Sequence, residues 1–287
     1  MSMKKCDLCP RNCNVDRTSS TGICGEKEEM SVNTYSVFMF EEPPISGTCG
    51  SGAIFFSGCS LKCVFCQNYE ISHNGHGTKV TPLGLVEIMK ELEGKGVHNI
   101  NLVSPSHFAD EIIKALKIYK PNVPVVWNTH GYEKVETIQK LLPYVDIFLT
   151  DFKYFEPKTA KKYSNCPDYV ENAKAALGVM VKNKPLEFDG EILKQGVIVR
   201  HLILPLHTQE SKQILDYLKQ NFDKQILVSV MSQFTPFGEC DNYPEINRKL
   251  TVREISCVNN YFLQLDLDGF IQSPNSADTC YIPNWNK

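Results

Sequence analysis

Six apolar strand segments, each followed by a helical segment, run along most of this chain of 287 residues. The pattern predicts strands at 52–57, 99–103, 123–127, 145–150, 196–204 and 225–230. It predicts helices at 82–93, 107–119, 132–142, 157–163, 168–182, 208–221 and 251–264. Strands that alternate with helices form a parallel sheet with right-handed crossovers. Six units are fewer than the eight of a closed barrel, so we expect an α/β fold of the open, partial (β/α)6 TIM-like barrel type.

Three cysteines directly follow the first of these strands. Cys59, Cys63 and Cys66 have the spacing C-x3-C-x2-C, and Phe65 stands just before the third. Thiolates this close in sequence can converge on one soft metal centre, such as zinc, copper(I) or an iron–sulfur cluster. Zinc sites usually repeat a C-x2-C pair, which this spacing does not, so an iron–sulfur cluster is favoured over a zinc knuckle or plain buried thiols. A [4Fe–4S] cluster takes four ligands, so one iron would remain for a ligand from outside this loop.

A second cysteine group lies near the N-terminus, where Cys6, Cys9, Cys13 and Cys24 stand within nineteen residues. Proline and glycine interrupt this segment, so a loop or knuckle is expected rather than a helix. Four thiolates complete a tetrahedral zinc site, and they also suffice for a second iron–sulfur cluster. The count leaves both alternatives open. We expect residues 1–50 to form a metal-binding extension with a strand at 30–41, and residues 51–287 to form the barrel.

Composition and charge argue against several classes of protein. Lysine and arginine number 30 against 33 aspartate and glutamate, a net charge of −3, and no basic patch indicates a nucleic-acid partner. No apolar run has membrane-spanning length, and the first lysines are not followed by the apolar core of a signal peptide. Seven of the twelve cysteines stand in ligand-like groups, which is typical of proteins of the reducing cytoplasm.

Polar side chains stand at or near the carboxyl ends of the predicted strands. In chain order they are Ser104, Ser106, His107, Asn128, Thr129, His130, Asp151, Lys153, Arg200, His201, Gln233 and Thr235. The carboxyl ends of parallel strands meet at one edge of a sheet, and active sites of such folds lie there. Arg200 lies inside an apolar strand, where a buried cation must meet a carboxylate or a ligand. Together with the cysteine loop, this set predicts an enzyme.

The cysteine loop, read as C-x3-C-x-aromatic-C, resembles the signature of the radical S-adenosylmethionine (SAM) superfamily. A narrower resemblance runs nearly from end to end of the chain. It is carried by CDLCPRNC, EEPPISG, GSGAIFFSGCSLKCVFCQN, NINLVSPSHF, WNTHGY, DFKYF, IVRHLILP, MSQFTPF and YIPNW. These segments resemble those of radical SAM proteins that are similar to pyruvate formate-lyase activating enzyme.

The resemblance implies roles for individual residues. The three cysteines of the loop would ligate a [4Fe–4S] cluster whose open iron binds the amino and carboxylate groups of SAM, with Phe65 beside them. Ser104, Pro105 and Ser106 stand where many members carry a Gly-Gly-Glu motif for the SAM amino group, and Lys153 and Arg200 occupy positions that resemble SAM contacts. Asn128, Thr129 and Asp151 match the place of a Na⁺ or K⁺ ion in activating enzymes, although Asn128 replaces a carboxylate there.

The implied activity is reductive cleavage of SAM to methionine and a 5′-deoxyadenosyl radical, which abstracts hydrogen from a substrate. A protein glycine of a glycyl radical enzyme is one candidate substrate, and a small molecule or peptide is another; flavodoxin or ferredoxin would supply the electron. The additional cysteines precede the loop instead of following it, which weakens the transfer of a glycyl-radical-enzyme substrate. Two different classes are a cluster-bearing electron-transfer or sensor protein and a zinc-stabilised binding module.

Overall fold

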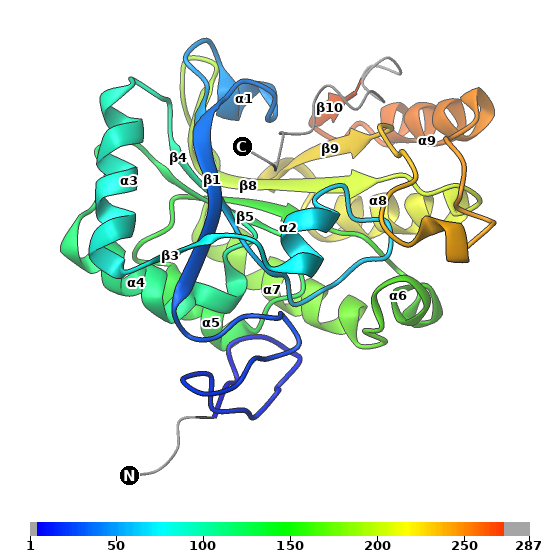
Figure 1. The fold of residues 1–287 in the computed structure, drawn as a ribbon. Helices are drawn as coiled ribbons and strands as arrows, with labels where there is room; N and C mark the ends of the chain where they lie inside the picture. The colour runs from blue at the N-terminus through cyan, green and yellow to red at the C-terminus, as the bar shows by residue number, and fades with distance from the viewer. Residues whose placement is uncertain (1–4, 273–287) are drawn as a thin grey trace.

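Seven parallel strands form the centre of one curved sheet (Figure 1). The computed structural model describes residues 5–272, so Cys280 and the matching segment 281–285 lie outside the described residues. In spatial order the strands are β2 (Ser51–Phe56), β4 (Ile100–Val103), β5 (Val125–Thr129), β6 (Ile147–Asp151), β8 (Ile192–Leu202), β9 (Leu227–Met231) and β10 (Gly269–Ile271). The first six correspond to the six predicted strands, and the open parallel α/β fold is confirmed.

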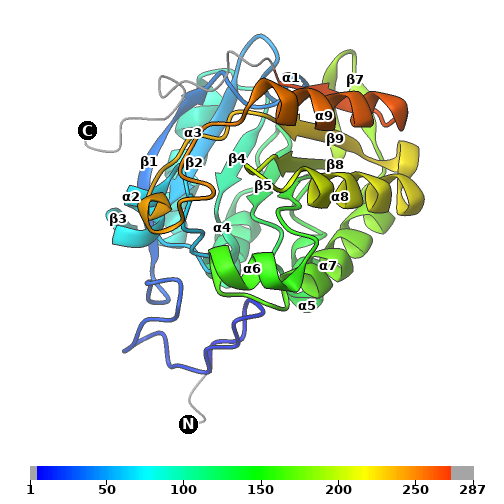
Figure 2. The ribbon, with the colours of Figure 1, turned by 90° about the vertical axis from the view of Figure 1, so that its right-hand side faces the viewer.

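Helices cover the outer face of this sheet, as Figure 2 shows for α7, α8 and α9. They are α3 (Pro82–Gly94), α4 (Ala109–Ile118), α5 (Val135–Leu141), α6 (Pro157–Ser164), α7 (Tyr169–Asn183), α8 (Thr208–Asn221) and α9 (Val252–Gln264). Thr81 caps α3 by accepting a hydrogen bond from Gly84 N (3.2 Å), and Pro82 starts the helix as expected. Ile54, Leu102 and Trp127 point from their strands into the main core beneath the helices.

Several short elements are absent from the prediction. They are α1 (Pro43–Ser46), α2 (Tyr69–Asn74), β3 (Thr78–Val80), β7 (Glu187–Asp189), β10 and three short 3₁₀ turns. The region 73–80 was expected to be a glycine-rich connector, yet it contains the end of α2 and all of β3. Segments of three to six residues carry too few apolar positions to show a period, so tertiary pairing decides their structure. None of the described helices is long and apolar enough to cross a membrane.

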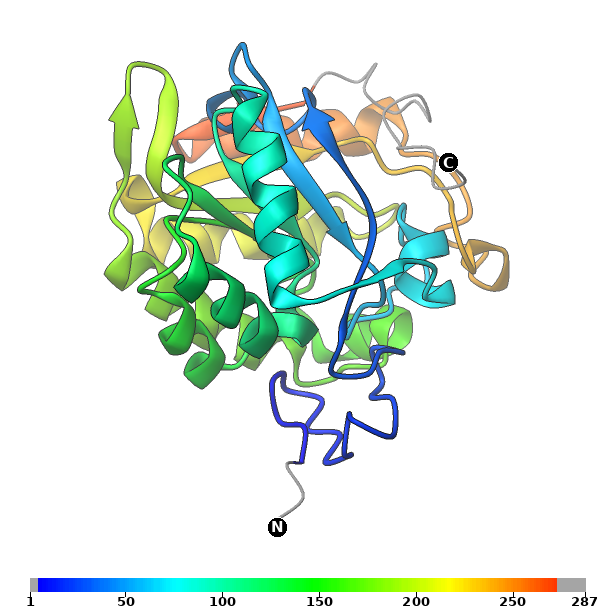
Figure 3. The same ribbon diagram turned by 60° about the vertical axis from the view of Figure 1, so that its left-hand side comes forward.

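The segment after β1 (Met30–Phe38) closes one end of the barrel. β1 runs antiparallel to β2 and pairs Phe38 with Ser51, so it ends at the amino end of β2. The chain then turns into the open end of the barrel toward α1. β1 therefore ends at Phe38, whereas the predicted strand continued to residue 41. In α1, fully buried Ile45 joins a small core with Leu149 and Ile198 on the inner face of the sheet. Figures 1 and 3 show α1 and the N-terminal segment at opposite ends of the molecule.

The boundary predicted at residue 50 remains a prediction about independent domains. In the structure β1 lies on one side of that boundary and pairs with β2 on the other.

Because Ile45 fills the floor of the barrel, Ile45→Ala should lower the free energy of unfolding by about 2–5 kcal/mol. Chemical denaturation monitored by circular dichroism measures this loss. The matched control is Ile118→Ala on α4, whose side chain is 55% exposed and should cost far less. Equal losses for the two variants would contradict the contribution of buried Ile45 to the core at this end of the barrel.

Candidate active site

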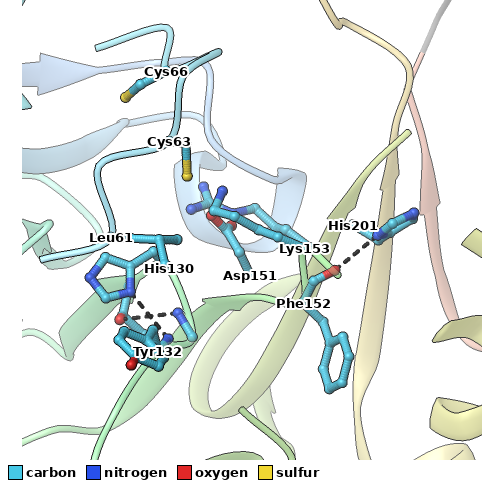
Figure 4. Close-up of polar contacts among 12 residues, drawn as sticks. Leu61, Cys63, Cys66, His130, Tyr132, Asp151, Phe152, Lys153 and His201 are labelled. Atoms are coloured by element: carbon cyan, nitrogen blue, oxygen red, sulfur yellow. Dashed lines mark hydrogen bonds and ion pairs between the residues drawn. The ribbon is translucent and has the colours of Figure 1, made fainter. Parts of the chain in front are cut away.

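A cavity of about 840 Å³ lies between the cysteine loop and the inner face of the sheet. We call residues 57–68 the cluster loop. Cys59, Cys63 and Cys66 all line the cavity, together with polar residues at the ends of β5, β6 and β8 and with residues 39–43 from the barrel floor. Eight of the twelve strand-end residues line this cavity with the cysteines, whereas Ser106, His107, His201 and Thr235 do not. His107 bonds to Ser57 O (2.7 Å), and His201 bonds to Phe152 O (2.9 Å) and Ser211 Oγ (2.8 Å). Figure 4 shows Cys63 pointing toward Asp151 and Lys153.

Each sulfur of the cluster loop accepts a hydrogen bond. Leu61 N donates to Cys59 Sγ (3.4 Å), Ser164 Oγ to Cys63 Sγ (3.1 Å), and Ser72 Oγ to Cys66 Sγ (3.3 Å). Burial, with the neighbouring thiols adding to it, raises the pKa of Cys66 to about 12. Metal binding to this loop would therefore release protons, and the donors would stabilise the resulting thiolates.

The three thiols fit a [4Fe–4S] cluster by their chemistry. Within residues 5–272, no three His, Cys, Asp or Glu side chains stand close enough to form a finished metal site. The three cysteines are nevertheless free thiols on one short loop, they line one cavity, and each already has a hydrogen-bond donor. Phe65 is buried behind them, with its ring edge-to-face against Tyr154, Tyr163 and Phe234, so it supports the loop through its packing.

Contacts from distant segments hold the cluster loop in place. Gly58 has a φ of +78°, and a Cβ there would lie 2.7 Å from Cys24 O, so only glycine fits. His130 Nδ1 accepts a hydrogen bond from Tyr132 N (3.1 Å), so its Nε2 carries the proton and donates to Ser60 Oγ (3.0 Å; Figure 4 shows His130 and Tyr132). Burial lowers the pKa of His130 to about 3, which keeps the ring neutral.

Arg11 fastens the N-terminal extension to the back of the cluster loop. Its guanidinium donates to the carbonyl oxygens of Ser60 (2.8 Å), Leu61 (3.1 Å), Ser164 (2.7 Å) and Asn165. Cys59 N also donates to Cys24 O (3.2 Å), which ties the two cysteine groups together through their backbones. The sequence analysis did not identify Arg11; the segment CDLCPRNC, in which it lies, was the only signal.

The four N-terminal cysteines share one knuckle. A Cβ on Gly22 would lie 3.4 Å from Cys13 Sγ and 3.5 Å from Cys24 Sγ, so these two sulfurs flank one glycine. Burial raises the pKa of Cys9 to about 12. The prediction of a zinc ion or a second cluster at Cys6, Cys9, Cys13 and Cys24 stays a prediction.

Arg200 organises the polar floor of the cavity. It donates to Asp151 Oδ1 (2.8 Å) and Asn128 Oδ1 (2.6 Å), and it lies 3.4 Å from Glu41 Oε2. Lys153 Nζ donates to the other Asp151 oxygen (2.6 Å; Figure 4). Although burial opposes ionisation, the Arg200 and Lys153 cations lower the pKa of Asp151 to about 2. Arg200, whose side chain is 15% exposed, therefore meets carboxylates, as we expected from its place in an apolar strand.

Glu41 is a site residue that sequence reasoning missed. Its side chain is 9% exposed, and Oε1 accepts hydrogen bonds from Asn101 (2.9 Å) and Asn128 (3.2 Å). Burial raises the pKa of Glu41 to about 7, in spite of the Arg200 cation beside it. The acidic pair before Pro43 was visible in the sequence, but nothing local indicated that it enters the barrel.

Two strand-end hydroxyls donate hydrogen bonds to buried Glu133. Ser106 was expected at the SAM amino group, but it is fully buried, and its hydroxyl donates to Glu133 Oε1. A 3₁₀ turn (Ser106–Phe108) begins at this residue, and Ser106 bonds toward α5, whereas Ser104, with a φ of +57°, lines the cavity. The Thr129 hydroxyl also donates to Glu133, and its oxygen accepts a hydrogen bond from Gly131 N (3.3 Å), which leaves it one lone pair.

Two other oxygens expected to bind a Na⁺ or K⁺ ion already accept a hydrogen bond, and the ion site stays a prediction. Arg200 binds Asn128 Oδ1 and one oxygen of Asp151, so its guanidinium supplies the positive charge where that ion was expected.

The Radical SAM superfamily model matches residues 53–218, from β2 to α8, which is more than half of the chain. This chain belongs to the radical SAM superfamily. Membership implies a [4Fe–4S] cluster and SAM as cofactors. MJ0674 of Methanocaldococcus jannaschii, an uncharacterized protein, is 33% identical over 262 residues, which cover 88% of this chain and 72% of that protein.

Solved structures of low sequence identity share the fold. SuiB of Streptococcus suis bound to S-adenosylmethionine has a TM-score of 0.51 and 14% identity, over 75% of this chain and 48% of SuiB. This chain therefore spans about half the length of SuiB, and at this identity the similarity shows the fold alone. A domain of pyruvate-formate lyase-activating enzyme from Bacteroides vulgatus ATCC 8482 has a TM-score of 0.39 and 10% identity, over 67% of this chain and 91% of that domain. That score supports no argument.

Arg11→Ala should lower the free energy of unfolding by about 2 kcal/mol or more, because it leaves several partly buried carbonyl groups without a charged donor. Chemical denaturation measures this, and Arg11→Lys should recover only part of the loss, since one ammonium cannot reach all four oxygens. The control is Arg253→Ala on exposed α9, expected within about 0.5 kcal/mol of wild type. If Arg11→Ala is as stable as that control, the hydrogen bonds of Arg11 do not stabilise the fold.

Glu41 should make stability depend on pH. Its pKa is about 7 in the folded chain against an ordinary value of 4.5, so the folded state binds the proton more tightly. The stability that this provides is complete below pH of about 4.5 and is lost as the pH rises through about 7, a change of about 3 kcal/mol. Between pH 4.5 and 8, the unfolding free energy of wild type should therefore fall by this amount relative to that of Glu41→Gln. Exposed Glu136→Gln is the control, and a pH-independent difference for Glu41→Gln would contradict the assignment.

Proposed function

We propose that this chain cleaves SAM reductively and uses the product radical to abstract hydrogen from a substrate bound in the barrel cavity. The observation that carries the proposal is that three cluster-loop thiols and the Arg200-centred floor face one cavity of about 840 Å³. This volume lies within the range of ligand sites, about 300–1,000 Å³. An electron carrier or a zinc-stabilised binding module would not need such a polar cavity beside its cysteines.

Cys59, Cys63 and Cys66 would hold the [4Fe–4S] cluster. When bound, the cluster supplies the electron that breaks a carbon–sulfur bond of SAM. The chain's own residues would bind the cluster and SAM and orient them in the cavity. The hydroxyls of Ser164 and Ser72 donate to two of the sulfurs and so favour the reduced cluster. The cluster loop and the barrel floor enclose the cavity and limit the access of water.

Lys153 is the residue best placed to hold the SAM carboxylate. Among the described residues its side chain pairs with Asp151 alone, and it lines the cavity below Cys63. Arg200, by contrast, already shares its guanidinium among Asp151, Asn128 and Glu41, so it would position Asp151 and through it Lys153. Ser104 would contribute backbone groups near the SAM amino group from its left-handed conformation.

Activation of a glycyl radical enzyme is one form of this proposal, and it is supported by the resemblance of the chain segments to activating-enzyme relatives. Modification of a small molecule or peptide is the other, and the buried carboxylates of the cavity floor favour it. Flavodoxin or ferredoxin would deliver the electron. We propose a cytoplasmic location, since both cysteine groups must be reduced to bind a metal. The N-terminal cysteines would bind zinc or a second cluster.

The test is anaerobic reconstitution of the cluster, followed by dithionite and SAM, with 5′-deoxyadenosine measured by mass spectrometry. Wild type should form 5′-deoxyadenosine, and Cys63→Ala should form none and lose the cluster signal in electron paramagnetic resonance. The matched control is Cys49→Ala, since Cys49 is exposed and does not line the cavity. An intact cluster without any 5′-deoxyadenosine would overturn the proposal.

A further inference from the structure

We propose that Glu41 and Glu42 form a subsite that binds a positively charged amine of the substrate, carried on an apolar carbon frame. The inference rests on the proposed function, because it names the substrate class of the same cavity.

The two carboxylates reach the cavity from the end opposite the cluster loop. β1 ends beside Ser51, at the start of β2, whereas the cluster loop begins after Phe56, at the end of β2. A strand of six residues separates its two ends by roughly 17 Å. The resemblance to the superfamily places the amino group of SAM at the open iron of the cluster. Glu41 and Glu42 therefore enter the cavity from the end opposite the one at which the open iron would bind SAM.

The carboxylates on the cavity floor outnumber the cations there. Glu41, Glu42 and Asp151 line the cavity against Lys153 and Arg200. Asp151 takes the closest contacts of both cations, at 2.6 and 2.8 Å, and leaves Glu41 with a longer contact of 3.4 Å to Arg200. At pH 8, above the pKa of about 7 of Glu41, one negative charge of the floor is without a matching positive charge among these lining residues, and a cationic ligand would balance it.

Glu42 provides the second, independent observation. Its side chain belongs to a residue only 8% exposed, and Oε2 is fully buried without a hydrogen-bond partner in the described part of the chain. Glu42 occupies the N-cap position of α1, yet its side chain makes no capping hydrogen bond. Glu42 Oε2 is therefore an acceptor on a cavity-lining residue without a donor among residues 5–272, and an ammonium group, which has three N–H donors, would supply one.

The walls beside these acceptors are apolar. Phe55, Val103 and Ile71 form a buried cluster on the inner face of the sheet, with Phe38 packed against it, and all four line the cavity. A hydrocarbon frame would remove this surface from water, while the carboxylates would repel an anionic ligand. A bare metal ion fits less well, because hard cations take six or more oxygen ligands, and the oxygens of Glu41, Asn128 and Asp151 already accept N–H donors.

The test compares two probes of equal shape, hexylamine and 1-hexanol, by isothermal titration into the cluster-loaded enzyme with SAM bound, without reductant, at pH 8. Hexylamine should bind about tenfold more tightly than 1-hexanol or better. Glu42→Gln and Glu41→Gln/Glu42→Gln should reduce this preference to about threefold or less. The control is Glu87→Gln on α3, whose side chain is 73% exposed and which should keep the full preference.

Equal binding of the two probes to wild type would overturn the subsite, and so would a preference that survives in the double variant. A preference seen only before SAM is added would also overturn it, because the carboxylates would then hold the amino group of SAM itself. The proposed function is judged separately: 5′-deoxyadenosine formation without amine preference removes the subsite alone, whereas amine preference without SAM cleavage removes the radical chemistry alone.

Discussion

The cavity depends on the hydrogen bonds of the partly buried Arg200 guanidinium. This guanidinium links β8 to Asp151 on β6, to Asn128 on β5 and to Glu41 on the floor segment. A buried arginine without partners would be costly, so each of these acceptors is needed for the fold as well as for the site. Because Asp151 is held from one side by Arg200, it can hold Lys153 on the other. One cation thus orients Asp151, and through it Lys153, the proposed SAM contact, and it also contacts Glu41.

The cluster loop depends on a second set of contacts, which come from the start of the chain. Arg11 binds carbonyl groups of the loop and of the C-terminal end of α6, and Cys24 O accepts from Cys59 N. Ser164, the last residue of α6, also donates its hydroxyl to Cys63 Sγ. The N-terminal knuckle, the cluster loop and the end of α6 therefore form one connected unit, and a change in the knuckle can reach the sulfurs that face the cavity.

Sequence reasoning succeeded where local pattern decides structure. The apolar runs of β2, β4, β5 and β6 predicted the parallel sheet, and the Thr81-Pro82 start predicted α3. It failed where the position of a side chain, inside or outside the cavity, depends on contacts with distant segments. Ser106 follows the end of β4 in the chain, so it was expected in the cavity, but it begins a 3₁₀ turn and its hydroxyl bonds to Glu133. Glu41 has no motif of its own, and it enters the site only because the chain turns beneath the barrel after Phe38.

By itself, the sequence determined that this chain has a strand–helix sheet and a loop of three thiols at the end of its first strand. Periodicity and cysteine spacing are local properties, so both can be read without knowing which segments meet. Only the tertiary structure decided that Arg200 pairs with Asp151 and Glu41, that Arg11 supports the cluster loop, and that Glu42 faces the cavity without a partner among the described residues. These contacts join residues that are far apart in the chain, so no local pattern in the sequence predicts them. Their free energies depend on how far each group is removed from water, which only the folded structure determines.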